Sequence, residues 1–329
     1  MKKLINDVET MLSESLDGFA AAHADIVTLG EAAQFVRRRT PKPGKVALIS
    51  GGGSGHEPLH TGFVGHGMLD AACPGQIFTS PTPDQMLAAA QSVETGAGVL
   101  FIVKNYSGDM MNFQMAAEMV DCDNETVVVN DDVAVENSTY TTGRRGVAGT
   151  LIVEKIVGAA AERGDPLRKL KQLGDAVNNA TASMGVALTS CTVPAAGKPT
   201  FQIGADEMEM GVGIHGEPGR RRIKLAGADD IAHELTGAIL KDLSLKAGQQ
   251  VLLLVNGFGG TPLLELYVMV NAVHKLLAGH QVKVARHLTG SYVTSLEMAG
   301  CSVTVSALDD AQLALWDAPV HTAALRWGM

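Results

Sequence analysis

The sequence has few cysteines and no long uncharged apolar run. Its 329 residues include four cysteines, none of them in a CxxC pair: Cys73, Cys122, Cys191 and Cys301. This pattern argues against a zinc site or a disulfide framework, so we interpret the cysteines as small buried side chains in a reducing compartment. No apolar stretch is long enough to span a membrane, and nothing resembles a signal peptide. We therefore predict a cytoplasmic protein without membrane association.

A concentrated positive charge is also missing. The net charge is −9, and the short basic cluster "GRRRIK" at 219–224 we interpret as a solvated loop. This balance argues against nucleic acid as the main partner, because phosphate binding requires a concentrated basic face. Nucleotide-binding signatures are missing where a phosphate loop would be expected: the glycine cluster "GGGSGHEP" does not give GxGxxG, and the sequence contains no GxxxxGK[ST] and no protein-kinase motif.

The first half of the chain alternates between strand and helix patterns. Apolar strands are predicted at 45–50, 98–105 and 125–130, and helices at 83–93, 110–120 and 147–164. We expect Ser107 and Asp109 to cap the second of these helices, and Gly164 to end the third before Asp165 caps another. A further amphipathic helix is expected at 2–19, packed on the body. Fully apolar strands between helices predict a mostly parallel sheet covered on both faces.

The second half shows a different pattern. Strands are predicted at 184–194, 207–216, 250–256, 282–288 and 302–308, with helices at 229–243 and 262–279. We therefore predict an α/β protein of two domains. Residues 1–183 would form a three-layer domain with a mostly parallel sheet, and residues 184–329 an α+β domain.

Two strand ends in the first half carry polar residues. The strand "KVALIS" runs directly into "GGGSGHEP", which contains Gly53 and His56, and the strand at 98–105 brings Lys104 and Asp109. Ligands bind at the carboxyl ends of strands in open α/β sheets, so these residues are expected in one crevice, where they can orient hydroxyls and move protons. The alternatives remain a solvated His56 in a tight turn, a surface Lys104 and a helix-capping Asp109.

A second glycine–histidine cluster, "GVGIHGEPG", surrounds His215 with small residues. An imidazole that attacks a carbonyl has to approach it closely, and we interpret Gly213 and Gly216 as leaving room for a small substrate. Such a histidine must be neutral to act as a nucleophile. The residues alone favour a packed structural histidine over a nucleophile.

Several motifs together resemble the dihydroxyacetone kinase family. They are "LISGGGSGHEPLHTGFVGHGMLDAACPGQIFTSPTPDQ", "VKNYSGDMMNF", "DDVAV", "GRRGVAGT", "CTVPAAGKP", "EMEMGVGIHGEPG" and "LALWDAPVHT". The resemblance is to the dihydroxyacetone-binding K subunit or domain, and it extends over essentially the whole chain.

The resemblance implies a role for each candidate residue. His215 would hold the ketose covalently as a hemiaminal, and His56 would assist in forming it. Gly53 and Lys104 would hydrogen-bond the substrate, and Asp109 would be the base that activates the hydroxyl to be phosphorylated. Because a hemiaminal requires a carbonyl, glycerol should be rejected.

The resemblance also implies partners. No cofactor is expected on this chain: ADP and Mg²⁺ would be bound by a separate L subunit, which a phosphotransferase-system M component rephosphorylates. The K subunit would be a homodimer. Two alternatives stay open, namely a dihydroxyacetone-sensing coactivator of a transcription regulator, and a kinase subunit for a related ketose such as erythrulose.

Overall fold

The computed structural model describes residues 2–30, 34–134 and 143–329. The described helices are α1 (Met11–Ala22), α2 (Pro83–Val93), α3 (Ser107–Met119), α4 (Gly149–Arg163), α5 (Leu167–Asn179), α6 (Ala228–Leu243), α7 (Leu263–Gly279) and α8 (Asp310–Asp317). The described strands are β1 (Val27–Leu29), β2 (Val36–Arg38), β3 (Ala47–Ser54), β4 (Gly65–His66), β5 (Ala71–Ile77), β6 (Val99–Lys104), β7 (Asn124–Val129), β8 (Thr181–Ala187), β9 (Glu207–Met210), β10 (Arg221–Lys224), β11 (Gln250–Gly257), β12 (Lys283–Gly290), β13 (Gly300–Ala307), β14 (Val320–Thr322) and β15 (Arg326–Trp327).

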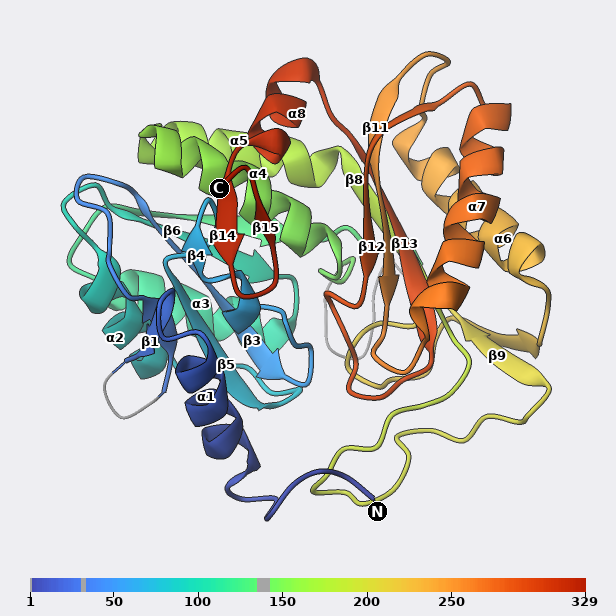
Figure 1. The fold of residues 1–329 in the computed structure, drawn as a ribbon, viewed down its shortest axis with the longest axis horizontal. Helices are drawn as coiled ribbons and strands as arrows, with labels where there is room; N and C mark the ends of the chain where they lie inside the picture. Colours follow the sequence, from blue (N-terminus) through green and yellow to red (C-terminus); the bar gives the residue numbers. More distant parts are fainter. Residues whose placement is uncertain (1, 31–33, 135–142) are drawn as a thin grey trace.

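The first sheet has the strand order β1-β2-β5-β3-β6-β7. Its strands β5, β3, β6 and β7 pair in parallel, while β1 and β2 add an antiparallel edge. Helices α2 and α3 cover one face, and α4 and α5 cover the other (Figure 1). The predicted three-layer arrangement with a mostly parallel sheet is therefore confirmed.

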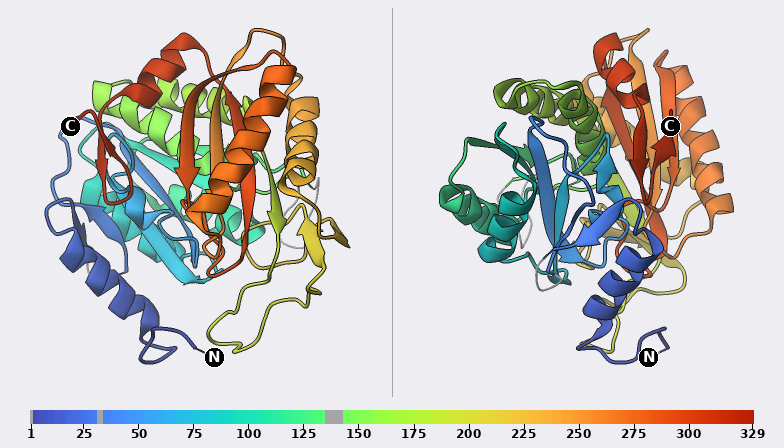
Figure 2. Two further views of the ribbon diagram at one scale, coloured as in Figure 1. Left: turned by 45° about the vertical axis from the view of Figure 1, so that its right-hand side comes forward. Right: turned by 60° about the vertical axis from the view of Figure 1, so that its left-hand side comes forward.

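The second sheet has the order β10-β9-β8-β13-β11-β12. Only β11 and β12 pair in parallel, and the other described neighbours are antiparallel, which confirms an α+β pattern. Helices α6 and α7 pack on its outer face, and its inner face turns towards α4. The molecule is thus layered in this order: α2 and α3, the first sheet, α4 and α5, the second sheet, and α6 and α7 (Figure 2).

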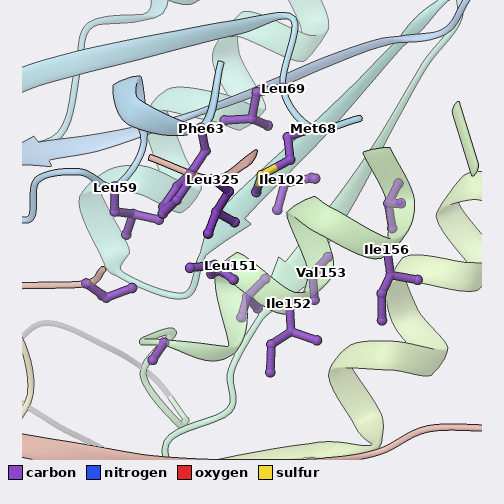
Figure 3. Packing of buried hydrophobic residues seen from close by; sticks show 14 of the residues in the cluster. Leu59, Phe63, Met68, Leu69, Ile102, Leu151, Ile152, Val153, Ile156 and Leu325 are labelled. Atoms are coloured by element: carbon purple, nitrogen blue, oxygen red, sulfur yellow. The ribbon is translucent and has the colours of Figure 1, made fainter. Parts of the chain in front are cut away.

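Helix α4 lies at the centre of the molecule because it is apolar on almost every side. Leu151, Ile152, Val153 and Ile156 are all buried, and they join one core cluster that reaches both sheets (Figure 3). A helix that is hydrophobic all round belongs inside a protein, and each such side chain contributes about 1.5–3 kcal/mol on burial. As predicted, the helix ends at Gly164, which adopts a left-handed φ of 93°.

The C-terminal strands pack against the first half of the chain. Strand β14 pairs antiparallel with both β15 and β4. The predicted boundary between residues 183 and 184 falls inside β8, so the exact ranges 1–183 and 184–329 stay a prediction. Among the described residues, no helix is both long and apolar enough to cross a bilayer.

Several local predictions are wrong at the N-terminal side. The helix expected from residue 2 begins at Met11, and Leu4 is fully exposed, because the apolar spacing before Thr10 lacks a packing partner. Helix α3 begins with Ser107, after an N-cap at Tyr106, so the expected side-chain caps at Ser107 and Asp109 are not formed. Asp109 lies instead in the first turn with its side chain buried.

Three further predictions need correction. The basic segment expected as a solvated loop forms the edge strand β10, whose Arg222 donates a hydrogen bond to the buried Glu209. The strand expected to run to residue 216 ends at Met210, so His215 lies in a loop. Helix α5 follows an N-cap at Pro166, one residue after the cap expected at Asp165. In the "DDVAV" motif, Val135 lies outside the described residues.

Candidate active site

A pocket of ≈ 370 Å³ opens where β3 and β6 end beside the start of α3. The two strands are parallel neighbours, so their carboxyl ends meet at one edge of the sheet, where α/β proteins bind ligands. The pocket is lined by Gly53, Phe78, Thr79, Ser80, Tyr106, Ser107, Gly108, Asp109 and His215. The second half of the chain thus contributes His215 to an edge built by the first half.

His56 lies behind this pocket with its ring orientation fixed. Its Nδ1 lies 2.8 Å from the carbonyl oxygen of Thr294, and because a carbonyl only accepts, Nδ1 carries the proton and donates it. Burial, reinforced by the charge of Lys104, lowers the pKa of His56 to about 3. The ring is therefore neutral, and its Nε2 is a bare acceptor.

His215 lies within hydrogen-bond distance of Nε2 of His56. The two Nε2 atoms lie 3.3 Å apart, so His215 donates its Nε2–H to His56. The pKa of His215 is held well below its usual value by burial and by the neighbouring His56 and Lys104. The Nδ1 of His215 is buried and has no hydrogen-bond partner among the described residues. A neutral imidazole paired with a neutral base is the arrangement expected of a nucleophilic histidine.

Lys104 and Asp109 form the other side of the site. Lys104 is fully buried, and its Nζ lies 3.8 Å from Oδ2 of Asp109. Burial raises the pKa of the Asp109 carboxyl, an effect opposed by Lys104 and by a hydrogen bond from Ser80. Its Oδ1 has no hydrogen-bond partner within the described chain, which leaves an acceptor at the pocket wall.

The glycines around His215 have a different explanation from the one expected. A Cβ at Gly213 would lie 2.6 Å from Glu217 Oε1 and 2.8 Å from Arg145 Nη1. Gly216 has a φ of 70°, and a Cβ there would lie 2.9 Å from Cys191 Sγ. Close packing within the protein therefore requires both glycines, whereas we expected them to leave room for a ligand.

Comparison with known proteins identifies the family. The Dak1 domain profile matches residues 17–324, which is nearly the whole chain. The chain belongs to the dihydroxyacetone kinase family. It is 51% identical over 328 residues to the "PTS-dependent dihydroxyacetone kinase 1, dihydroxyacetone-binding subunit DhaK" of Listeria innocua, covering 98% of this chain and 100% of the relative.

Two solved structures of this dihydroxyacetone kinase family superpose closely. The dihydroxyacetone kinase of C. freundii, solved with AMP-PNP and Mg²⁺, matches with a TM-score of 0.90 and 32% identity, over 99% of this chain and 61% of that one. The dihydroxyacetone kinase operon co-activator DhaQ matches with a TM-score of 0.89 and 35% identity, over 94% and 96% of the two chains.

The structure thus brings together all the residues that the sequence predicted for the site of this family member: Gly53, His56, Lys104, Asp109 and His215. Sequence reasoning missed three neighbours, Thr294, His60 and Glu154. A glutamate inside the otherwise apolar pattern of α4 was a usable signal, because buried carboxylates require partners. Thr294 acts through its backbone carbonyl, which leaves no trace in residue type.

Proposed function

We propose that this chain is the dihydroxyacetone-binding subunit of a phosphoenolpyruvate-dependent dihydroxyacetone kinase, and that it holds the ketose as a hemiaminal on His215. One observation carries the proposal. The Nε2 atoms of two neutral histidines, His56 and His215, lie 3.3 Å apart beside a pocket that also contains Asp109. The names of the relatives supply the substrate class.

The hemiaminal forms in a balanced step. As the ring nitrogen of His215 bonds to the carbonyl carbon of the ketose, its Nε2 proton passes to Nε2 of His56. The carbonyl π-bond breaks, and its electron pair moves to the oxygen. His56 then returns the proton to that oxygen, so the hemiaminal hydroxyl forms. The low pKa of His56 favours this return, because the protonated ring is a strong acid.

Asp109 and Lys104 serve the phosphoryl transfer. Asp109 accepts the proton of the terminal hydroxyl as that oxygen attacks the phosphoryl group, and its pKa, raised by burial, improves it as a base. Lys104 and Gly53 hydrogen-bond the ketose. Covalent attachment reduces the entropy lost in aligning the hydroxyl, and this is an advantage of the order expected for intramolecular reactions. The product is dihydroxyacetone phosphate.

The phosphoryl group reaches this site from other proteins. We propose an L subunit that binds ADP and Mg²⁺ and is rephosphorylated by a phosphotransferase M component, in the cytoplasm, with this chain as a homodimer. In support, two relatives carry names that make them the dihydroxyacetone-binding subunit of a PTS- or PEP-dependent kinase.

Two measurements test the proposal. Intact-protein mass spectrometry under non-denaturing conditions, after incubation with dihydroxyacetone, should show an increase of one ketose per chain, and glycerol should give none. Adding an L subunit, the phosphotransferase components and phosphoenolpyruvate should then consume dihydroxyacetone. A chain that forms no adduct contradicts the covalent role, and an adduct without turnover with any cognate L subunit contradicts the kinase role.

The likeness to the co-activator DhaQ supports a second candidate, a dihydroxyacetone-sensing coactivator. A sensor does not need a base for phosphoryl transfer, so the pocket carboxylate Asp109 favours the kinase subunit. Pull-down with an L subunit on one side and a transcription regulator on the other separates the two. Competition between dihydroxyacetone and erythrulose decides the preferred ketose.

A further inference from the structure

Beneath the pocket, three buried polar side chains form a continuous chain of hydrogen bonds. Lys104 Nζ lies 2.7 Å from Nε2 of His60, and Nδ1 of His60 lies 2.6 Å from Oε1 of Glu154. The exposed fractions of Lys104, His60 and Glu154 are 0%, 4% and 0%. Burying such groups is unfavourable unless each is paired, so this hydrogen-bonded network of three side chains needs an explanation beyond packing.

The first link fixes the position of the Lys104 ammonium. An ammonium has three protons to donate, and two are used by the Gly51 carbonyl at 3.1 Å and by His60 Nε2. Gly52 makes room for this placement, since a Cβ there would collide with Nζ. Asp109 Oδ2 lies 3.8 Å from Nζ and raises the pKa of Lys104 through its charge. Since that distance exceeds the usual length of a hydrogen bond, we assign the third proton to the ketose.

The second link fixes the tautomer of His60. An ammonium only donates, so Nε2 of His60 has to accept, and its single proton must be on Nδ1. Two oxygens lie near Nδ1: Glu154 Oε1 at 2.6 Å and Ser50 Oγ at 3.0 Å. The Ser50 hydroxyl donates its own proton to the Ile102 carbonyl. Glu154 is therefore the closer acceptor, and it keeps His60 in the form that holds Lys104.

We propose that His60 and Glu154 are positioning residues of the kinase site: His60 holds the Lys104 ammonium against the pocket, and Glu154 selects the His60 tautomer that does so. His60, Glu154 and Lys104 are all buried behind the lining of the pocket, and Lys104 is the one of the three that lies next to the lining residue Asp109, so His60 and Glu154 act through Lys104. This inference rests on the proposed function, because Lys104 is taken there to hydrogen-bond the ketose.

The charges around the Lys104–His60–Glu154 network predict how the protonation of Lys104 depends on pH. The groups facing Lys104 are Asp109, Glu154 and His60, and both carboxyls raise its pKa against the lowering effect of burial. His60 itself faces Lys104 and His56, and its pKa lies well below the usual value, so it stays neutral. Burial raises the pKa of Glu154 to about 8, so its carboxylate is charged only on the alkaline side of that value. Removing that charge should therefore move a deprotonation of Lys104 in the alkaline range to lower pH.

The test compares two substitutions at residue 60. His60→Phe fills the space but cannot accept a hydrogen bond, whereas His60→Gln packs less well but offers an amide oxygen to Lys104. If His60 positions Lys104, His60→Phe should weaken dihydroxyacetone binding roughly 10- to 100-fold, and His60→Gln should recover most of it. If His60 only fills space, the order is reversed. Calorimetric titration of the purified full chain measures both, and melting temperature reports folding.

A matched pair on helix α4 tests the charge. Glu154→Gln keeps an acceptor for His60 but removes the charge, and Glu162→Gln removes a carboxylate two turns away that pairs with Arg38. With the L subunit present, Glu154→Gln should shift the alkaline limb of the kcat profile to lower pH, and Glu162→Gln should leave it unchanged. Identical profiles for wild type and Glu154→Gln overturn the role of Glu154, even if His60→Phe fails to fold.

The position of the Lys104 ammonium can also be measured without any ketose bound. If the wild type forms no adduct, the proposed function fails, and the Lys104 ammonium itself becomes the readout. A buried, hydrogen-bonded Nζ should give a slowly exchanging ammonium signal in nitrogen-15 NMR, assigned by its loss in Lys104→Arg. That signal should persist in His60→Gln and disappear in His60→Phe. Persistence in His60→Phe overturns the positioning role.

Discussion

The two glycine–histidine clusters look alike in sequence but do opposite things in the structure. The first, at 51–60, continues β3 into a buried turn, and the Thr294 carbonyl fixes the His56 tautomer. The second, at 211–219, is a loop beyond β9, and His215 Nδ1 lacks a hydrogen-bond partner among the described residues. One histidine is held in a single protonation form, and the other is free to change bonding.

This difference fits the two roles that we propose for His56 and His215. A base that must accept and return a proton benefits from one fixed acceptor atom, which the carbonyl bond to His56 provides. A nucleophile benefits from a ring that hydrogen-bonds that base through one nitrogen and keeps the other nitrogen without a hydrogen-bond partner, as His215 does among the described residues. Glycines serve both clusters through tight packing of the protein itself.

The largest expected effect follows removal of the nucleophile. His215→Ala should abolish the dihydroxyacetone adduct entirely, because no other imidazole lines the pocket as described. Intact-protein mass spectrometry measures this, with His287→Ala as a control at a histidine outside the pocket. A full adduct in His215→Ala would refute the assignment of the covalent role.

Next in size is the loss of the phosphoryl-transfer base. Asp109→Asn should retain the adduct but reduce kcat with the L subunit by about 10²- to 10⁴-fold, the range typical of general bases. Adduct mass and coupled turnover are measured on the same preparation. If adduct and turnover vanish together, Asp109 is needed to form the adduct and the division of roles is wrong.

A smaller effect is expected for the fixed histidine. His56→Asn places an amide near the Thr294 carbonyl but offers no base to His215, so adduct formation should slow by about 10²-fold while the final extent stays high. Time-resolved quenching and mass analysis give the rate. A rate equal to wild type would mean that His215 needs no proton acceptor.

The smallest expected effect is that of pH on the rate of adduct formation. Because burial and Lys104 lower the pKa of His56 to about 3, the neutral base persists at every pH well above 3. The pKa of His215 is also lowered, so the nucleophile stays neutral in the same range. The adduct rate should therefore be nearly flat from about pH 5.5 to 8. A loss with a midpoint near the ordinary histidine value of about 6.5 would show that the pair is solvated.

Periodicity in the sequence was sufficient for the layers and for most elements. Helix α2 was predicted at its observed bounds, 83–93, because Pro83, the Thr82 cap and the apolar spacing agree. Prediction failed where tertiary contacts decide: β9 stops at Met210 although the alternation continues, and Asp109 turns inward towards Lys104 instead of capping α3. The site residues were found from motif resemblance, whereas His60 and Glu154 required the fold, since 94 positions separate them.

The contact between Thr294 and His56 also constrains how the protein is made. The two residues are 238 positions apart, and β14, which follows them, closes on β4. A ribosome releases the N-terminal sheet long before the residues that complete its site, and contacts of such sequence separation form late. The nascent chain should therefore lack the contact that fixes the His56 tautomer until translation is almost finished, and under the proposed chemistry an incomplete chain would not capture free ketose.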